Sequence, residues 1–247
     1  KQRQVELINY ATKSERVHPK LKLCLALGGM LGLGLGLMIS LLQEITARTF
    51  RTGEEISRRL GLPVLAEIGL FARKRLKSSE HPSVSAELIT VHRPHSAPAE
   101  MFKALRTKIL FDSTDRSSKA IQITSPTQGD GKSMVAANLA VSIAQAGRSV
   151  LLVDCDLRRP SQHAMFSLEA DVPGLTSIIV GNASYTDAIQ TVGVEHLSII
   201  SAGVKYSNPA ELLSGNGLPA LLSRLRNKYD FIILDTPPIL PVTDSRI

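Results

Sequence analysis

A glycine-rich stretch that also contains a lysine and a serine lies near the middle of the sequence, at Thr124–Val135. It follows a short apolar run and leads into an Ala/Leu-rich segment, so we expect a strand, a loop and a helix in that order. Gly129 and Gly131 would let successive backbone N–H groups face one anion at the start of the helix. Lys132 could then reach the β- and γ-phosphates of a nucleotide, and the Ser133 hydroxyl could ligate Mg²⁺.

This stretch departs at one position from the phosphate-loop pattern G-x-x-x-x-G-K-[ST], because Pro126 stands where the first glycine would be. The alternative interpretation is a glycine-rich turn before an ordinary helix. The predicted ATP-binding residues are the consecutive loop residues Gln128, Gly129, Asp130, Gly131, Lys132, Ser133 and Met134.

Acidic residues end two apolar runs downstream of the loop. Asp154 and Asp156 follow the run 151–153, and Asp235 follows the run 231–234. Ligand sites in open parallel sheets lie at the carboxyl ends of the strands, so these side chains are expected near the bound phosphates. Mg²⁺ takes one or two carboxylates plus phosphate oxygens, and a second Asp can accept the proton of an attacking hydroxyl. Each Asp alone could instead be a helix or turn cap, but the three together predict an Mg-ATP site.

The elements needed to hold this site alternate along the chain. Strands are predicted at 120–124, 149–154, 197–201 and 231–235, and helices at 99–111, 132–146, 175–180, 186–191, 209–213 and 218–228. Near-continuous apolar strands separated by helices indicate an α/β fold, a P-loop NTPase-type parallel sheet with helices on both faces. We expect the domain at 99–247 to be incomplete at its C-terminal end, since such domains continue with more strands.

An uncharged run at Leu23–Leu42, within a predicted transmembrane helix at 21–43, precedes that domain. At about 1.5 Å per residue it would span roughly 30 Å, the thickness of a bilayer core. The alternative is a buried core helix. Gly28, Gly32 and Gly36 would lie near one helix face, where another helix could approach. The two flanks have equal net charge (six minus two and eight minus four), so the positive-inside rule does not orient the span.

Composition and the place of the nucleotide site indicate the nature of the remaining segments. Residues 1–20 are expected to end an extracytoplasmic domain, and residues 44–98 to form a cytoplasmic juxtamembrane segment and linker, because ATP is available in the cytoplasm. Within the linker we expect a short helix at 52–60 with Thr52 as its cap, and a flexible tether at 78–98. The formal net charge of +7 would suit anionic lipid or nucleotide, whereas 4% aromatic residues and no Trp argue against single-stranded nucleic acid.

Three segments together resemble the bacterial tyrosine kinases (BY-kinases) fused to polysaccharide co-polymerases. They are ITSPTQGDGKSMVAANLA, similar to the family's Walker A; VLLVDCDLRRP, similar to Walker A′; and FIILDTPPILPVTD, similar to Walker B. In the helix at 99–111 the family's ring-assembly pattern Glu-x-x-Arg-x-x-Arg reads Glu100, Lys103, Arg106. Lys103 cannot reproduce the planar fork of the replaced Arg.

The resemblance implies roles for the site residues. Lys132 would stabilise the transferring phosphoryl group, Ser133 and Asp156 would hold Mg²⁺, Asp154 would be the catalytic base, and Asp235 would support metal or water. It also implies a bacterial inner-membrane protein that phosphorylates tyrosines of its own copies and governs the chain length or export of a polysaccharide. Expected partners are the polysaccharide polymerase and export machinery and a tyrosine phosphatase.

Two alternatives stay open. One is a membrane-bound switch ATPase of the septum-positioning or plasmid-partition type. The other is a co-polymerase with a non-catalytic nucleotide domain, because the four tyrosines are scattered and no acceptor cluster is present in this sequence.

Overall fold

The computed structural model describes residues 20–46, 52–69, 84–112 and 119–240. The chain divides into two compact units, Lys1–Leu62 and Pro63–Ile247. The predicted end of an extracytoplasmic domain at 1–20 lies outside the described residues except for Lys20.

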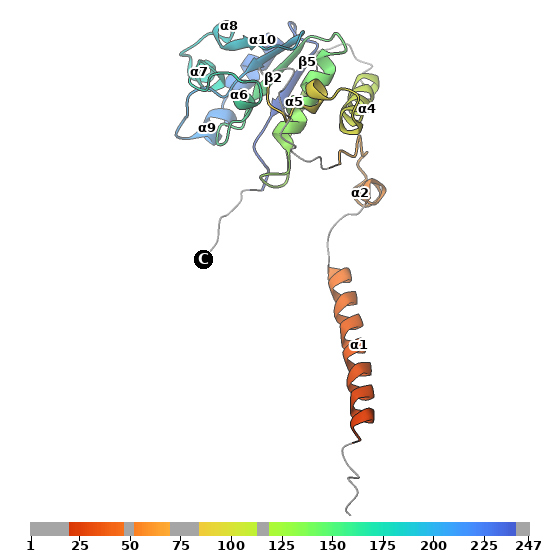
Figure 1. The fold of residues 1–247 in the computed structure, drawn as a ribbon. Coiled ribbons are helices and arrows are strands. Elements are labelled where there is room, and N and C mark those ends of the chain that lie inside the picture. The colour runs from red at the N-terminus through yellow and green to blue at the C-terminus, as the bar shows by residue number, and fades with distance from the viewer. Residues whose placement is uncertain (1–19, 47–51, 70–83, 113–118, 241–247) are drawn as a thin grey trace, which may run out of the picture. The chain divides into compact units, whose positions relative to one another are not determined.

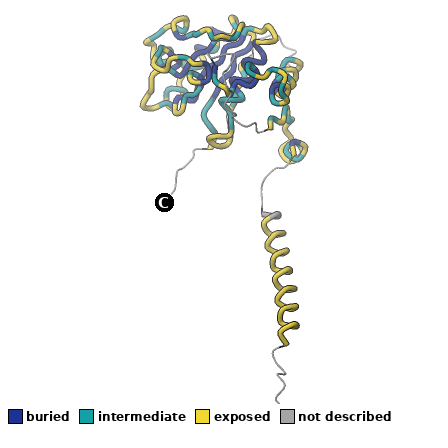
Figure 2. Tube along the Cα trace, viewed as in Figure 1, coloured by how far each residue is buried: buried dark blue, intermediate teal, exposed yellow. Residues whose placement is uncertain are grey.

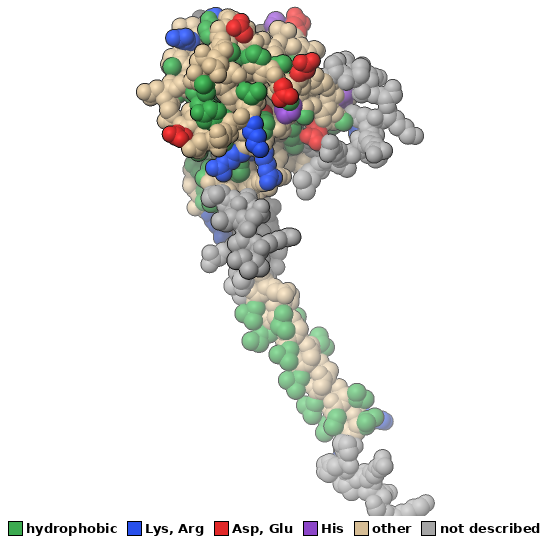
Figure 3. All heavy atoms as spheres, turned by 90° about the vertical axis from the view of Figure 1, so that its left-hand side faces the viewer, with side chains coloured by type: hydrophobic (Ala, Val, Ile, Leu, Met, Phe, Trp, Pro, Cys, Tyr) green, Lys and Arg blue, Asp and Glu red, His purple; other side chains and the backbone are tan. Residues whose placement is uncertain are grey.

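The first unit contains the expected apolar helix, α1 (Leu21–Thr46). Its segment Leu21–Gln43 is long and apolar enough to cross a membrane, and none of it is buried within the protein. Figure 3 shows hydrophobic side chains along this helix. Exposing them to water is unfavourable, whereas placing them in hydrocarbon is favourable. A Cβ added at Gly28, Gly32 or Gly36 would meet no atom within 4 Å beyond the helix's own backbone and the adjoining residues, so that face is open.

The short helix after it, α2 (Gly53–Leu60), has the predicted ends. The Thr52 hydroxyl accepts a hydrogen bond from the Glu55 backbone N–H at 3.3 Å. Gly61 adopts the left-handed conformation, φ 66°, which favours glycine. The prediction of a helix at 52–60 capped by Thr52 is confirmed.

In the described residues the second unit is built on a five-stranded sheet in the order β1-β5-β2-β4-β3. Figure 1 labels two of its inner strands, β2 and β5. The strands are β1 (Lys119–Ile123), β2 (Val150–Asp154), β3 (Ile189–Thr191), β4 (Leu197–Ile200) and β5 (Phe231–Asp235). All pairings are parallel except that of β3 with β4. The central strands are buried completely (Figure 2), which explains why they read as apolar runs.

Helices cover both faces of this sheet, as predicted. Val150 and Leu152 of β2 belong to the apolar cluster that contains α5 (Lys132–Ala144). Leu151 and Val153, which point the other way because side chains alternate along a strand, belong to a second cluster. The other helices are α3 (Ile89–His92), α4 (Ala97–Asp112), α6 (Gln162–Met165), α7 (Leu175–Val180), α8 (Tyr185–Ala188), α9 (Pro209–Ser214) and α10 (Gly217–Leu225).

Two local predictions are wrong. The expected helix at 186–191 is only the four residues of α8, after which the chain enters β3 and pairs antiparallel with β4. The expected tether at 78–98 is ordered from Val84 onward, because Leu88 is fully buried against the core. The Asn138 side chain of α5 accepts hydrogen bonds from the Thr90 backbone N–H and hydroxyl, which fixes this segment to the domain.

Candidate nucleotide site

The glycine-rich loop lies between β1 and α5, as the sequence predicts. Gly129 and Gly131 have φ of 89° and 90°, a region that side-chain-bearing residues rarely occupy. The Asp130 carboxylate accepts hydrogen bonds from the Thr127 backbone N–H at 2.8 Å and from its hydroxyl at 2.7 Å. These bonds lower the pKa of Asp130, so it stays ionised and holds the loop in shape.

The chain after β5 supports this loop from the side. The backbone N–H groups of Thr236, Ile239 and Leu240 donate to the carbonyls of Ile123, Ser125 and Pro126 at 2.9–3.1 Å. Pro126, which replaces the first glycine of the phosphate-loop pattern, therefore uses its carbonyl to fix the loop. We call this set of three bonds the loop ladder.

The register of the sheet brings the three predicted motifs to one edge. Asp154 and Asp235 are directly opposite each other in the β2–β5 pairing, and Ile123 is opposite Asp235 in the β1–β5 pairing. The glycine loop begins just after β1, so all three motifs meet at the carboxyl end of the sheet.

Lys132 lies between two of the acidic residues. Its Nζ is 2.6 Å from Asp156 Oδ2 and 3.5 Å from Asp235 Oδ1, and it donates to the Ser133 hydroxyl at 3.0 Å. Burial disfavours the ammonium form, but the hydrogen bond to Asp156 and the nearby negative charges outweigh this effect and raise the pKa of Lys132. The ammonium therefore neutralises the Asp156 and Asp235 carboxylates, which would also face a bound nucleotide and metal.

Asp154 is completely buried, and both of its oxygens are used by the backbone. Oδ1 accepts from the Asp156 N–H, and Oδ2 accepts from the N–H groups of Ser161 and Gln162. Loss of hydration raises the pKa of Asp154 to about 7, although these bonds favour the ionised form. The carboxylate therefore fixes the loop between β2 and α6.

Gln162, the first residue of α6, belongs to the site although the sequence analysis did not include it. It is fully buried, and its amide nitrogen donates to Asp235 Oδ2 at 2.8 Å and to the Ser133 carbonyl at 3.0 Å. A glutamine near a helix start is not unusual, so no pattern in the sequence indicates this burial. Its only signal is that it follows Pro160 and Ser161, where a helix can begin beside the predicted site.

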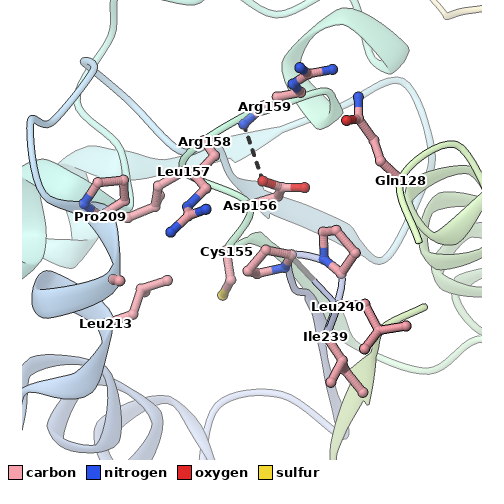
Figure 4. A pocket seen from close by; sticks show the side chains of 13 residues that line it. Gln128, Cys155, Asp156, Leu157, Arg158, Arg159, Pro209, Leu213, Ile239 and Leu240 are labelled. Atoms are coloured by element: carbon pink, nitrogen blue, oxygen red, sulfur yellow. Dashed lines mark hydrogen bonds between the residues drawn. The ribbon is translucent and has the colours of Figure 1, made fainter. Parts of the chain in front are cut away.

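A cavity of about 530 Å³ opens beside these residues (Figure 4). Asp156 lines it together with Gln128 of the glycine loop and Arg158 of the segment after β2. Apolar walls come from α9 and from the segment after β5: Pro209, Ala210, Leu213, Pro237, Pro238, Ile239 and Leu240. The Arg159 backbone N–H donates to Asp156 Oδ1 at 3.1 Å, the bond drawn in Figure 4.

Within the described ranges, no three His, Cys, Asp or Glu side chains are placed to hold a metal on their own. Mg²⁺ takes few protein ligands and completes its shell with phosphate oxygens and water, so Ser133, Asp156 and Asp235 could hold it beside a bound nucleotide. Buried oxygens without a hydrogen-bond donor are also present, at Asp235 Oδ1 and Gln162 Oε1. Gln162 Oε1, which has no partner, leaves a cost of about 1–3 kcal/mol that a donor such as a metal-bound water could remove. Asp235 Oδ1 has the Lys132 ammonium at 3.5 Å as an ion-pair partner.

The remaining predicted residues lie on or near these elements. Met134 packs against the first apolar cluster from the start of α5. On α4, Lys103 pairs with Glu100 at 2.8 Å on the exposed surface. Arg106 donates to the Ser142 carbonyl of α5 at 2.9 Å, so its guanidinium already has one partner within the chain.

Comparisons with known proteins agree with this geometry. The AAA domain family matches residues 118–246. The tyrosine-protein kinase YwqD of Bacillus subtilis is 42% identical over 172 residues, which are 70% of this chain and 72% of YwqD. The tyrosine-protein kinase etk of Escherichia coli K12 is 30% identical over 247 residues, and the match covers 96% of this chain but 34% of etk.

The fold of this chain is also similar to those of solved structures. The chimerical protein CapA2B2 aligns with a TM-score of 0.67 and 37% identity over 78% of each chain. The kinase domain of the Escherichia coli tyrosine kinase ETK aligns with a TM-score of 0.68 and 30% identity over 78% of this chain and 75% of that domain. With its loop, its lysine and its paired acidic strand ends in this arrangement, the chain belongs to the family of bacterial tyrosine-protein kinases.

Proposed function

We propose that this chain is a membrane-anchored protein tyrosine kinase that uses ATP to phosphorylate tyrosines on copies of itself. The observation that carries the proposal is the placement of the Lys132 ammonium between Asp156 and Asp235 at the start of α5. Phosphoryl transfer needs little more from the protein than positioning and charge neutralisation, and these residues can provide both.

ATP would bind with its phosphates against the backbone of the loop 128–134, and Lys132 would turn from the carboxylates to the phosphoryl oxygens. Ser133, Asp156 and Asp235 would hold Mg²⁺, which, when bound, neutralises charge that develops on those oxygens. The buried oxygens that lack donors at Asp235 and Gln162 support a cation at this place.

Asp154 would accept the proton of the attacking tyrosine hydroxyl. Its pKa of about 7 suits a base that works near neutral pH. Because its oxygens are closed off by the backbone of the loop 156–162, this loop has to shift for the hydroxyl to reach the carboxylate.

The cavity beside Asp156 would receive the acceptor tyrosine. Its proline and leucine walls suit an aromatic ring, and Arg158 suits acidic residues around the tyrosine. A second copy would present that tyrosine, held through Glu100, Lys103 and Arg106 of α4. Arg106 would use donors beyond the one that its contact with Ser142 employs.

The apolar helix α1 supports a place in the bacterial inner membrane with the kinase unit in the cytoplasm. Control of polysaccharide chain length or export is proposed from the family resemblance, as are the polymerase and export machinery and a phosphatase as partners.

The test is to incubate the full chain in membranes with labelled ATP, Mg²⁺ and a Glu/Tyr copolymer as an added acceptor. We expect labelled phosphotyrosine, and none with Lys132→Met. The matched control is Lys228→Met, whose lysine precedes β5 and so lies at the opposite end of the sheet. Labelling that persists in Lys132→Met would contradict the proposed site. Phosphate release without phosphotyrosine would favour a switch ATPase, and no nucleotide binding would favour a non-catalytic co-polymerase domain.

A further inference from the structure

One buried side chain connects the three nucleotide motifs. The Gln162 amide nitrogen donates to the Ser133 carbonyl beside Lys132 and to Asp235 Oδ2 at the end of β5. Its backbone N–H donates to Asp154 Oδ2 at the end of β2, at 3.0 Å. A change at Gln162 therefore reaches each of the three motifs.

The chemistry of the neighbours fixes how this amide is oriented. The Ser133 carbonyl and an ionised Asp235 carboxylate can only accept hydrogen bonds, so the NH₂ group, and not the oxygen, must face them. Both amide hydrogens are then used. Gln162 Oε1 remains, and in the described structure it is buried with no donor.

Asp235 Oδ1 is a second buried oxygen without a hydrogen-bond donor. Asp235 Oδ2 is held by Gln162, whereas Asp235 Oδ1 has no hydrogen-bond donor and only the Lys132 ammonium at 3.5 Å. Gln162 thus holds one oxygen of the carboxylate and leaves the other for a cation. Buried acceptors in native proteins usually find a hydrogen-bond donor. Gln162 Oε1 has none, and Asp235 Oδ1 has only an ion pair with Lys132, so the two oxygens of these contacting residues suit a further group that donates or is positive.

We infer that Gln162 is a positioning residue of the magnesium site, which orients Asp235 toward the metal and offers Oε1 to a water molecule of the hydrated ion. The inference rests on the proposed function and deepens it. Mg²⁺ keeps several of its waters in proteins, and residues that orient its ligands affect affinity for the metal.

A purely structural role for Gln162 predicts something different. If the side chain only closes the interior beside α6, its replacement would weaken the fold and lower affinity for nucleotide equally with and without metal. If it orients Asp235, its replacement should lower the affinity for nucleotide measured with Mg²⁺ and leave the affinity measured without metal nearly unchanged.

The experiment measures ADP binding by calorimetry to the full chain in detergent, with Mg²⁺ and with EDTA, for wild type and for Gln162→Leu. Wild type should bind ADP more tightly with Mg²⁺. In Gln162→Leu this gain should fall by about 10- to 100-fold, the usual effect of losing a residue that orients a metal ligand. The affinity measured in EDTA should change by less than about threefold.

Two further variants make the result decisive. Gln162→Met keeps the length of the side chain but removes both the donor to Asp235 and Oε1, so it should lose the gain as well; it replaces Gln162→Leu if that variant does not fold. Gln190→Leu is the matched control, since Gln190 is a half-buried glutamine on the edge strand β3 with a hydrogen bond to Ser201. It should behave as wild type.

A gain from Mg²⁺ that is unchanged in the Gln162 variants, or a loss that is equal with and without metal, would overturn the inference while leaving the proposed function intact. If wild type itself bound no ADP with Mg²⁺, the proposed function would fall, and the inference with it.

Discussion

Replacing Lys132 by Met should destabilise the domain even when no nucleotide is present. The side chain of Lys132 is 10% exposed, that of Asp156 is 5% exposed, and that of Asp235 is 0% exposed. The variant would remove the ammonium and leave two nearly buried carboxylates at one edge of the sheet. Met has a similar length, so the change removes charge more than volume.

The expected cost follows from this burial. Exposed ion pairs are worth about 0–1 kcal/mol, whereas removing one partner of a buried pair costs about 3–5 kcal/mol. Because Lys132 and Asp156 keep slight contact with water, we expect the lower end, about 3 kcal/mol. For a unit of this size about 1 kcal/mol lowers Tm by about 2–4 °C, so Tm should fall by roughly 6–12 °C.

The assay is thermal unfolding of the full chain in detergent, followed by circular dichroism in EDTA without nucleotide. The double variant Lys132→Met with Asp156→Asn removes one of the two unpaired charges, so it should recover about 1–2 kcal/mol of the loss. Equal Tm values for wild type and Lys132→Met, or a double variant less stable than the single one, would refute the idea that the ammonium neutralises these carboxylates.

Three further predictions concern other parts of the second unit. Asp154→Ala leaves three backbone N–H groups without their acceptor, so the free energy of unfolding should fall by at least about 3 kcal/mol in urea titrations; a loss below 1 kcal/mol would contradict this role. Gly174→Ala places a Cβ 2.4 Å from backbone atoms of the neighbouring loop and should cost about 1–3 kcal/mol, whereas Gly193→Ala, with open space around it, should be nearly neutral in the same titration. The pKa of Tyr185 is lowered because the Lys228 ammonium, 2.9 Å from its hydroxyl, stabilises the phenolate. Lys228→Met should therefore raise the pKa of Tyr185 in a tyrosinate absorbance titration. An unchanged titration would show that the contact is absent in solution.

Much of the site could be predicted because its signals are local. An apolar run that ends in Asp is a strand end, and parallel strands bring their carboxyl ends to one edge, so Asp154 and Asp235 were expected to be neighbours. The loop glycines and Lys132 stand at fixed offsets within a single stretch. The positions of these residues confirm the predicted grouping, whereas their catalytic and metal-binding roles stay predictions.

The errors have a different physical origin. Residues 189–191 become a strand only because β4 offers a free edge, and no local pattern in three residues indicates that pairing. The segment 78–98 carries Ser, His and Pro with little periodicity, which predicts a tether. In the structure, however, Leu88 packs in the core and the Thr90 N–H donates to Asn138. Gln162 is important only because two chain segments far from it in sequence converge on its amide.

The loop ladder has a consequence for motion. Its three backbone hydrogen bonds join the chain after β5 to the glycine loop, so neither segment can move away from the other without breaking them. The two should open and close as one unit, and slow hydrogen exchange at Ile239 and Leu240 should then report on whether the glycine loop is closed. An isotope label some distance along the chain could thereby follow the state of the phosphate pocket without touching it.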